Sequence, residues 1–324
     1  MTKLEEIREI LAGDMCRLND IIAASLQSNS ELMNTVVTQH LAVKGKQLRP
    51  LLTLLSGRLF GGVNDSVLYA GAAIELLHNA SLIHDDVIDQ AKLRRGVATI
   101  SNVYDNHIAV LTGDFFITSA LRCAVKTGDP RILDELANMG GTLSLGEIDQ
   151  ISNAQRRDID EESYMEIIGK KTAVLFETCV AVGGYARNAD PSLIEPLRRY
   201  AYLLGLCFQM KDDTFDYFDD PVIGKPTGND LREGKITLPL IYALSRTDLP
   251  EHDEMVQLVH KPELGETDID RLVTFAKDAG GIDYTNSVME RLCTEADSLL
   301  DSFNQSDTIV ALRQLFRYII VRNI

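Results

Sequence analysis

Leu82-Ile-His-Asp-Asp-Val-Ile-Asp89 closes an otherwise apolar segment with three carboxylates. In an α-helix, which rises about 1.5 Å per residue, side chains four positions apart lie on the same face. Asp85 and Asp89 therefore share one face, and Asp86 flanks it. The preceding residues 68–83 are apolar nearly all the way round, which is typical of a helix buried inside a helical protein.

Gln209-Met-Lys-Asp-Asp-Thr-Phe-Asp216 repeats this arrangement after the apolar residues 202–210. Asp212 and Asp216 share a face, and Asp213 flanks it. Unpaired buried carboxylates are costly, and each cluster has only one histidine or lysine beside it. Mg²⁺, which carboxylates hold together with substrate phosphates, would supply the missing charge. Solvated helix ends in an acidic chain are the alternative for either cluster alone, and the repetition argues against them.

The composition limits the class of protein. The chain has 324 residues, of which 45% are hydrophobic, and a formal net charge of -16, which argues against nucleic acid as a partner. Its five cysteines show no C-x-x-C spacing and are typical of reduced thiols in the cytoplasm. The first ten residues do not have the pattern of a signal peptide, and apolar runs such as 174–186 are shorter than a membrane span. We therefore expect a cytoplasmic protein.

Helical periodicity dominates the whole chain, and nothing in it is typical of a sheet. Glycine and proline clusters predict breaks between helices, among them Gly140-Gly141 and Gly183-Gly184. No linker or shift in composition separates two parts. We therefore predict an all-α fold with a single domain over residues 1–324.

The long predicted loop at residues 219–234 directly follows the second acidic cluster, is rich in glycine and proline, and carries Lys225. Such a loop suits a lid over a phosphate site, and a plain surface loop is the alternative.

Basic residues occur at positions that suit a diphosphate, whose oxygens bind Arg and Lys. Each alone is more often a solvated surface charge. The candidates are Lys46, Arg49, Arg94, Arg95, Lys170, Lys171, Lys225 and Lys235.

Together these motifs resemble those of the trans-isoprenyl diphosphate synthases, or polyprenyl synthetases, over nearly the whole chain. The matching motifs are Gly45-Lys46-x-x-Arg49-Pro50, His84-Asp85-Asp86-x-x-Asp89, Arg94-Arg95-Gly96, Gly113-Asp114, Lys171-Thr172, Phe208-Gln209-x-x-Asp212-Asp213-x-x-Asp216, Gly224-Lys225 and Gly234-Lys235-x-Thr237-x-Pro239. The combination is highly specific. One departure is Gln47, where the family usually has arginine, so a positive charge near the site is missing.

The resemblance implies a helical bundle of the isoprenoid synthase type with a central cavity. It also implies a Mg²⁺-dependent condensation of isopentenyl diphosphate with an allylic diphosphate, such as farnesyl or geranylgeranyl diphosphate, with two or three ions. The implied metal ligands are Asp85, Asp89 and Asp212, helped by Asp86, Asp213 and Asp216. The implied ligands of isopentenyl diphosphate are Lys46, Arg49, His78 and Arg95. Those implied for the allylic diphosphate are Arg94, Lys171, Lys225 and Lys235, with Thr172 and Gln209 near the developing cation. The residues expected to act in catalysis are Asp85, Asp89, Asp212, Lys171 and Gln209.

The residues themselves agree with this chemistry. Breaking a carbon–oxygen bond to give an allylic cation mainly requires neutralisation of the leaving diphosphate, which metal ions provide. The sequence shows no convincing Ser-His-Asp or Cys-His nucleophile, and the reaction requires none. His78 is by residue type more often a satisfied core histidine, and only the resemblance favours a binding role.

The product length is predicted from the helical face that precedes Asp85. Ser81 lies one turn before Asp85, with Ala80 beside it and Leu77 one turn further. Short-chain members of the family tend to block this path with an aromatic residue, so Ala80 and Ser81 predict a long all-trans product of the kind found in quinone side chains. Close helix packing is the alternative role for these small residues. Leu77, Ile74 and the helix that contains Phe115-Phe116 are each candidates for the floor of this path. A floor at Leu77 would give a short-chain product, geranylgeranyl or farnesyl diphosphate.

Three other classes of protein share some of these features but fit the sequence less well. A class I terpene cyclase lacks the second diphosphate site that Lys46, Arg49 and Arg95 predict. A phosphohydrolase of the His-Asp type needs further histidines in a metal-binding motif, and a non-catalytic synthase subunit would be expected to lose its Asp motifs. The resemblance further implies a homodimer, and release of a lipid product suggests peripheral contact with a membrane.

Overall fold

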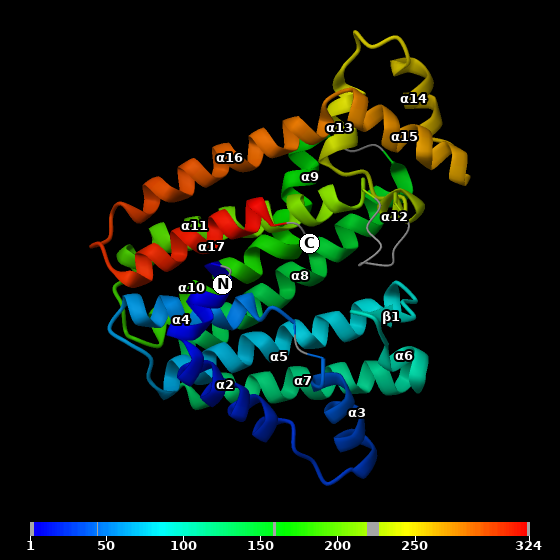
Figure 1. Ribbon diagram of the computed structural model, residues 1–324. Helices are drawn as coiled ribbons and strands as arrows, with labels where there is room; N and C mark the ends of the chain where they lie inside the picture. Colours follow the sequence, from blue (N-terminus) through cyan, green and yellow to red (C-terminus); the bar gives the residue numbers. More distant parts are fainter. Residues whose placement is uncertain (1–2, 44, 158–159, 219–226, 323–324) are drawn as a thin grey trace. The chain divides into compact units, whose positions relative to one another are not determined.

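The computed structural model describes residues 3–43, 45–157, 160–218 and 227–322. Within these ranges the chain consists almost wholly of helices (Figure 1), so the predicted all-α class is confirmed. In chain order the helical elements are α1 (Lys3–Ile10), α2 (Ala12–Ser25), α3 (Glu31–Leu41), α4 (Leu48–Leu59), α5 (Asp65–Ile88), α6 (Ile100–Val103), α7 (Asn106–Lys126), α8 (Pro130–Arg156), α9 (Glu161–Ile168), the π-helical turn η1 (Gly169–Ala173), α10 (Val174–Tyr185), α11 (Pro191–Phe215), α12 (Asn229–Arg232), α13 (Leu238–Ser245), α14 (His252–Val259), α15 (Glu266–Asp278), α16 (Gly281–Leu300) and α17 (Asp307–Val321).

The chain divides into two compact units. The first comprises Met1–Gly140, Thr178–Arg198 and Gln305–Leu312, and the second comprises Gly141–Glu177, Arg199–Asn304 and Arg313–Ile324. The first acidic motif belongs to the first unit and the second motif to the second unit. One domain over residues 1–324 stays a prediction, and each unit is described by itself.

Helix α5 is the central helix of the first unit. Its start is capped by the Asn64 side chain, which accepts a hydrogen bond from the Val67 backbone N–H at 2.9 Å. The run from Val67 to Leu76 is buried except for Tyr69, and α7, α4 and α2 pack against the helix. Burial of this apolar surface is the main source of stability for the unit.

A short β-hairpin follows α5 and corrects the expectation that nothing forms a sheet. Strands β1 (Leu93–Arg94) and β2 (Val97–Ala98) pair in antiparallel fashion. Arg95 and Gly96 form the turn with φ values of 53° and 75°, the left-handed region that a tight two-residue hairpin requires. The hairpin therefore fixes the backbone positions from which the Arg94 and Arg95 side chains extend.

The predicted breaks at Gly140-Gly141 and Gly183-Gly184 are wrong, because both pairs lie inside helices. A Cβ at Gly183 would lie 2.6 Å from the carbonyl oxygen of Thr53 in α4, so this glycine permits close helix packing. The Ser56 hydroxyl also donates a hydrogen bond across the same contact, to the Val180 carbonyl at 2.6 Å.

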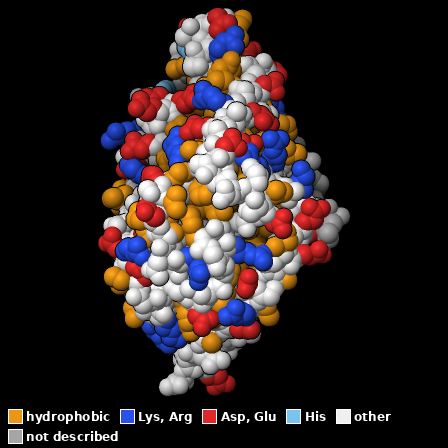
Figure 2. Space-filling view, turned by 90° about the vertical axis from the view of Figure 1, so that its left-hand side faces the viewer, with side chains coloured by type: hydrophobic (Ala, Val, Ile, Leu, Met, Phe, Trp, Pro, Cys, Tyr) orange, Lys and Arg blue, Asp and Glu red, His pale blue; other side chains and the backbone are white. Residues whose placement is uncertain are grey.

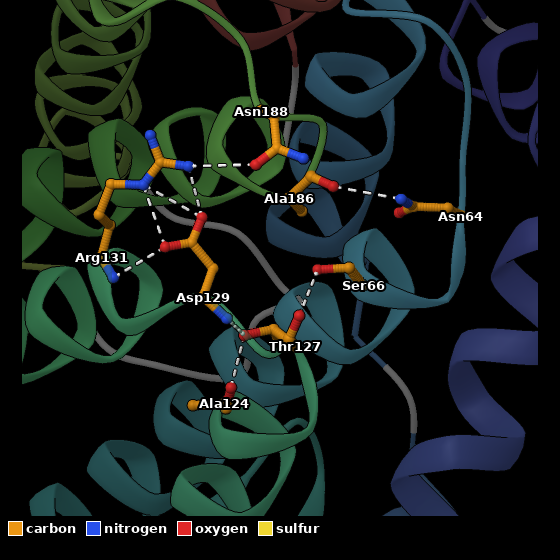
Figure 3. Close-up of polar contacts among 8 residues, drawn as sticks. All are labelled: Asn64, Ser66, Ala124, Thr127, Asp129, Arg131, Ala186 and Asn188. Atoms are coloured by element: carbon orange, nitrogen blue, oxygen red, sulfur yellow. Dashed lines mark hydrogen bonds and ion pairs between the residues drawn. The ribbon is translucent and has the colours of Figure 1, made fainter.

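Polar contacts tie the connection between α7 and α8 to the end of α10 (Figure 3). Arg131 donates from Nε to the Asp129 carboxylate at 3.0 Å and from Nη2 to Asn188 Oδ1 at 3.4 Å. Asn64 donates to the Ala186 carbonyl at 3.2 Å. The residue that caps α5 thus also anchors the C-terminal end of α10.

Helix α11 is the central helix of the second unit and ends in the second acidic motif. Tyr200 is fully buried in it, and its ring meets the ring of Phe316 edge-on with centroids 5.7 Å apart. A Cβ at Gly205 would lie 2.5 Å from the Cα of Ala173, so α11 approaches η1 closely. This approach positions η1 beside the acidic end of α11.

Two helices, α5 and α7, are long and apolar enough to span a membrane, which corrects the expectation that no run reaches that length. In the most apolar 18-residue stretch of each helix, 61% of α5 and 44% of α7 is buried inside the protein. A helix in the core of a soluble protein can be equally long and apolar. Acidic and basic side chains are interspersed over the face that Figure 2 shows, without a broad basic area.

Candidate active site

The first acidic motif presents three carboxylates in different surroundings. The Asp89 backbone N–H donates to the Asp85 carbonyl at 2.8 Å, so these two residues lie one helical turn apart, as predicted. Asp85 is half-buried and Asp89 is exposed, whereas Asp86 is buried and accepts a hydrogen bond from Arg94 Nε at 2.7 Å. Burial raises the pKa of Asp86, and Arg94 opposes this shift. Arg94, predicted to bind the allylic diphosphate, is paired with Asp86 in this structure.

The neighbouring His84 explains the Gly113-Asp114 motif. A Cβ at Gly113 would lie 2.1 Å from His84 Nε2, so only glycine leaves room for the imidazole against α7. The same nitrogen lies 3.2 Å from the Val110 carbonyl oxygen and 3.6 Å from an Asp114 carboxylate oxygen. This contact fixes the acidic end of α5 on α7.

The hairpin turn brings Arg95 to the loop that precedes α4. A Cβ at Gly45 would lie 2.5 Å from the Arg95 guanidinium, and both residues line a cavity of about 170 Å³ together with Gln47 and Glu75. Gln47, at the family's usual arginine position, has φ 47° and donates to Asn19 Oδ1 at 2.9 Å. Residues 45–47 and Arg95 of the predicted isopentenyl diphosphate site therefore come together within the first unit.

His78 and Arg49 lie in this same group. Burial lowers the pKa of His78 well below its usual range, and the positive charges of Arg49 and Arg95 add to that shift. Both effects favour the neutral imidazole. The Lys46 carbonyl accepts a hydrogen bond from Arg8 at 2.5 Å, which anchors the loop.

Sequence reasoning missed Glu75. This carboxylate is buried, and its Oε2 has no hydrogen-bond partner among the residues that the structure describes. Burial raises its pKa, while Arg49 and Arg95 oppose the shift. The signal was present, since Glu75 is the one charged residue in the apolar run 66–77 and precedes His78 by three positions.

Arg95 also lines a larger cavity of about 410 Å³. Arg94, Asp86, His40 and Tyr104 line it along with apolar side chains. The His40 imidazole lies 3.0 Å from Asn79 Oδ1, and burial lowers its pKa. His40, which the sequence did not single out, therefore faces the same cavity as the two arginines.

In the second acidic motif each carboxylate has a different protein partner. Asp212 accepts a hydrogen bond from Arg322. Asp216 accepts hydrogen bonds at 3.0 Å from two backbone N–H groups, those of Asn229 and Asp230, at the start of α12. The predicted ligands Asp212 and Asp216 are thus pre-oriented by the protein.

Asp213 is buried and accepts from the Tyr164 hydroxyl at 2.6 Å and from Gln209 Nε2 at 2.7 Å. Burial raises its pKa to about 6, and the two hydrogen bonds counteract the shift. Gln209 in turn accepts from the Thr172 hydroxyl at 2.7 Å. Thr172, Gln209 and Asp213 therefore form one hydrogen-bonded chain, which joins residues that the resemblance assigned separately.

Lys170 and Lys171 lie in the π-helical turn η1, a local geometry that is frequent at functional sites. Lys171 Nζ lies 2.7 Å from Glu147 Oε2, and Lys170 Nζ lies 2.9 Å from Asp149 Oδ2. Both lysines are held by carboxylates of α8.

Other predicted substrate-binding residues line a cavity of about 110 Å³ in the second unit. Its lining includes Lys171, Gln209, Asp213, Lys235, Thr237 and Asp230. Asp230, which sequence reasoning missed, has a pKa raised well above its usual range by burial, with Asp213 and Asp216 contributing. Its position inside the predicted lid, between Gly228 and Gly234, was the available signal.

Lys225 and residues 219–226 of the predicted lid lie outside the described residues. Asn229–Arg232 within that segment form the short helix α12, which corrects the prediction of one loop over the whole segment. Lys235 beyond it pairs with Glu233 at 2.5 Å.

The predicted chain-length residues differ in exposure. Ala80 is 1% exposed, whereas Ser81 and Leu77 are half-buried. The Ser81 hydroxyl donates to the His78 carbonyl at 2.9 Å, so it is satisfied within its own helix. Ala80 therefore serves close packing, the alternative role considered for it, while Ser81 and Leu77 stay candidates for contact with a product tail.

The donor chemistry fits a hard divalent cation. Asp85, Asp89 and Asp212 offer accessible carboxylate oxygens, the ligands that Mg²⁺ prefers. Within the described ranges no group of three or more metal-ligating side chains could hold an ion on its own. Mg²⁺ is usually bound through one or two carboxylates together with water and substrate phosphates.

Comparisons with known proteins agree with these motifs. Residues 30–275 match the family model described as polyprenyl synthetase. The chain is 33% identical over 298 residues to an octaprenyl diphosphate synthase of Escherichia coli, covering 92% of this chain and 91% of that protein. It is 32% identical over 254 residues to a geranylgeranyl diphosphate synthase of Saccharolobus solfataricus, covering 76% of each.

A crystal structure of a polyprenyl synthase from Caulobacter crescentus, complexed with calcium and isoprenyl diphosphate, is similar with a TM-score of 0.92 and 32% sequence identity over 98% of each chain. Sequence and fold thus agree along nearly the full length. The chain belongs to the polyprenyl synthetase family of prenyltransferases.

Proposed function

We propose that this prenyltransferase condenses isopentenyl diphosphate with an allylic diphosphate, farnesyl or geranylgeranyl diphosphate, to form a long-chain all-trans polyprenyl diphosphate. The observation that carries the proposal is that the chain has two complete Asp-Asp-x-x-Asp motifs and, in addition, a separate basic group at residues 45–49 and 95. Two diphosphates need two binding sets, and a terpene cyclase would need only one.

The carboxylates supply the metal-binding set. Mg²⁺, when bound, neutralises the departing diphosphate as a Lewis acid. In the first unit, Asp85 and Asp89 would hold a metal ion from α5. In the second unit, Asp212 would hold one from α11. Lys171 and Lys235, also in the second unit, would bind a diphosphate directly, so that negative charge on the leaving group is stabilised as the carbon–oxygen bond breaks.

The second diphosphate is bound by the group around Arg95. Lys46, Arg49 and Arg95 provide three positive charges, and neutral His78 donates a hydrogen bond. The double bond of isopentenyl diphosphate attacks the allylic carbon, and the proton lost afterwards goes to the departing diphosphate. Thr172 and Gln209, which are joined by a hydrogen bond, lie near the cation that forms.

A long product is favoured by the open face at Ser81, which presents no aromatic side chain. Similarity to an octaprenyl diphosphate synthase supports the same assignment. Similarity to a geranylgeranyl diphosphate synthase keeps a short-chain product as the alternative, with Leu77 as the floor that would cause it.

We also propose that the enzyme is a cytoplasmic homodimer that contacts the membrane only peripherally, on product release. Helix α7 carries an exposed apolar stripe at Val110, Leu111, Leu121 and Val125, with exposures between 40% and 66%. Burying such a stripe against a second copy would remove apolar surface from water. Replacing Leu111 and Leu121 by Glu should yield monomers in light scattering; an unchanged mass would contradict this interface.

The activity is tested by incubating the protein with Mg²⁺, farnesyl diphosphate and labelled isopentenyl diphosphate, and then sizing the products. We expect products longer than geranylgeranyl diphosphate. Asp85→Asn and Asp212→Asn should each lower kcat on the order of 100-fold or more, since each removes charge that orders the leaving group. Failure to incorporate label would refute the assignment, and a product that stops at geranylgeranyl diphosphate would favour the short-chain alternative.

A further inference from the structure

Arg322, directly after α17, is bound to the second acidic motif. Its Nη2 donates to Asp212 Oδ1 and to the Phe208 carbonyl oxygen, the latter at 3.2 Å. The guanidinium carbon lies 4.3 Å from the ring centroid of Phe208 and 5.5 Å from that of Phe215. One guanidinium is thus held by a carboxylate, a backbone carbonyl and two aromatic rings of α11.

Arg322 differs from Arg313 and Arg317, the arginines within α17. The Arg322 side chain is 6% exposed, whereas those of Arg313 and Arg317 are 27% and 61% exposed and pair with Asp297. Burying a guanidinium is unfavourable unless a carboxylate and hydrogen bonds compensate it. Asp212, 39% exposed, is the carboxylate that does so here.

The partner of Arg322 is also a candidate metal ligand. Carboxylates that bind metals are commonly oriented by a hydrogen-bond donor on the protein side, and losing that donor weakens metal binding. The aromatic rings and the Phe208 carbonyl fix the guanidinium in place, so it holds the carboxylate in one orientation before a metal arrives.

We propose that Arg322 is a positioning residue for the metal at Asp212: through Oδ1 it orients the carboxylate for coordination. The inference rests on the proposed function. Charge alone predicts the opposite effect on metal binding, because a guanidinium repels a divalent cation. On that ground, removing the Arg322 guanidinium would tighten metal binding. The two effects differ in sign, so one measurement separates them.

The experiment measures binding of Mn²⁺ in the presence of inorganic pyrophosphate, from the electron paramagnetic resonance signal of the free ion. The variants are Arg322→Gln, Arg322→Lys, Asp212→Asn and the double variant. Arg317→Gln, in the preceding helix α17, is the matched control, because the Arg317 side chain is exposed. Circular dichroism verifies that each variant is folded.

Asp212→Asn should abolish one Mn²⁺ site. Arg322→Gln should raise the dissociation constant of Mn²⁺ at that same site by roughly 10- to 100-fold. Arg322→Lys, which keeps the charge but not the planar donor, should recover part of this loss, and Arg317→Gln should change nothing. In the Asp212→Asn background the Arg322→Gln change should have no further effect, because it acts through Asp212.

Equal or tighter Mn²⁺ binding by Arg322→Gln would overturn the inference, as would an undiminished effect in the Asp212→Asn background or no Mn²⁺ binding by the wild type. Condensation by the wild type is assayed separately with farnesyl diphosphate and labelled isopentenyl diphosphate. Absence of product there refutes the proposed function, while the Mn²⁺ titration still decides the role of Arg322.

Discussion

The guanidinium group of Arg95 occupies the space that a side chain at Gly45 would need, since a Cβ there would lie 2.5 Å from Arg95 Nη2. Arg95 stands at a hairpin turn and Gly45 in the loop before α4, fifty positions earlier in the sequence. Glycine at position 45 is therefore what allows two motifs of one predicted diphosphate site to meet.

Gly45→Ala should displace the Arg95 guanidinium with little loss of stability, because a flexible side chain can move aside. We expect the KM for isopentenyl diphosphate to rise roughly tenfold, about 1.4 kcal/mol of binding, with a smaller change for the allylic substrate. Steady-state kinetics with each substrate varied in turn checks this. Gly13→Ala is the control, since nothing lies within 4 Å of its added Cβ. Equal changes in both KM values would count against a role specific to one substrate.

Ser81→Phe and Ala80→Phe should behave differently although the residues are neighbours. Ser81 is half-buried, so an aromatic ring there should block the product path and shorten the product. Ala80 is 1% exposed, so the same ring should overpack the core and lower the free energy of unfolding by about 1–3 kcal/mol. Product sizing and urea unfolding of both variants check this, and an unchanged product from Ser81→Phe would show that the tail runs elsewhere.

Deprotonation of Asp213 should lower the free energy of unfolding of the metal-free protein as the pH rises. Burial raises its pKa to about 6, above the ordinary value of 3.8, so the folded state holds a proton more tightly than the unfolded chain. The resulting stabilisation is fully present below about pH 4 and is lost as the pH rises through 6, at about 1.4 kcal/mol per pKa unit.

Asp213→Asn removes this proton equilibrium. In EDTA, the free energy of unfolding of the variant relative to the wild type should therefore increase from pH 4 to pH 7, by about 3 kcal/mol at most. Urea unfolding at four pH values measures the difference. Parallel pH profiles for the two proteins would contradict the raised pKa.

Gly183→Ala should destabilise the first unit, because the new methyl group would lie 2.6 Å from the Thr53 carbonyl oxygen, which belongs to a helix backbone that yields little. We expect a loss of about 1–3 kcal/mol in the free energy of unfolding. Gly140→Ala, inside α8 with nothing within 4 Å of the added Cβ, should instead stabilise by about 0.5–1 kcal/mol through helix propensity. Chemical unfolding of both variants distinguishes packing from propensity.

Sequence reasoning failed where an interaction was not local. Gly183-Gly184 suggests a break by composition, yet the pair lies inside α10 because helix packing needs a close approach there. The sequence predicted no sheet, whereas two short strands form a hairpin that holds Arg94 and Arg95. Glu75 and Asp230 were not singled out because only burial makes their carboxylates unusual.

By itself the sequence determined the helical class, the register of Asp85 with Asp89, and the family. Helical periodicity and spacing are properties of neighbouring residues, and ordered motifs need no coordinates. Only the tertiary structure decided that Tyr164 holds Asp213 and that Arg322 holds Asp212, partners 49 and 110 positions away. It alone also decided which carboxylates are buried, because burial and hence pKa arise from packing between segments that the chain keeps far apart.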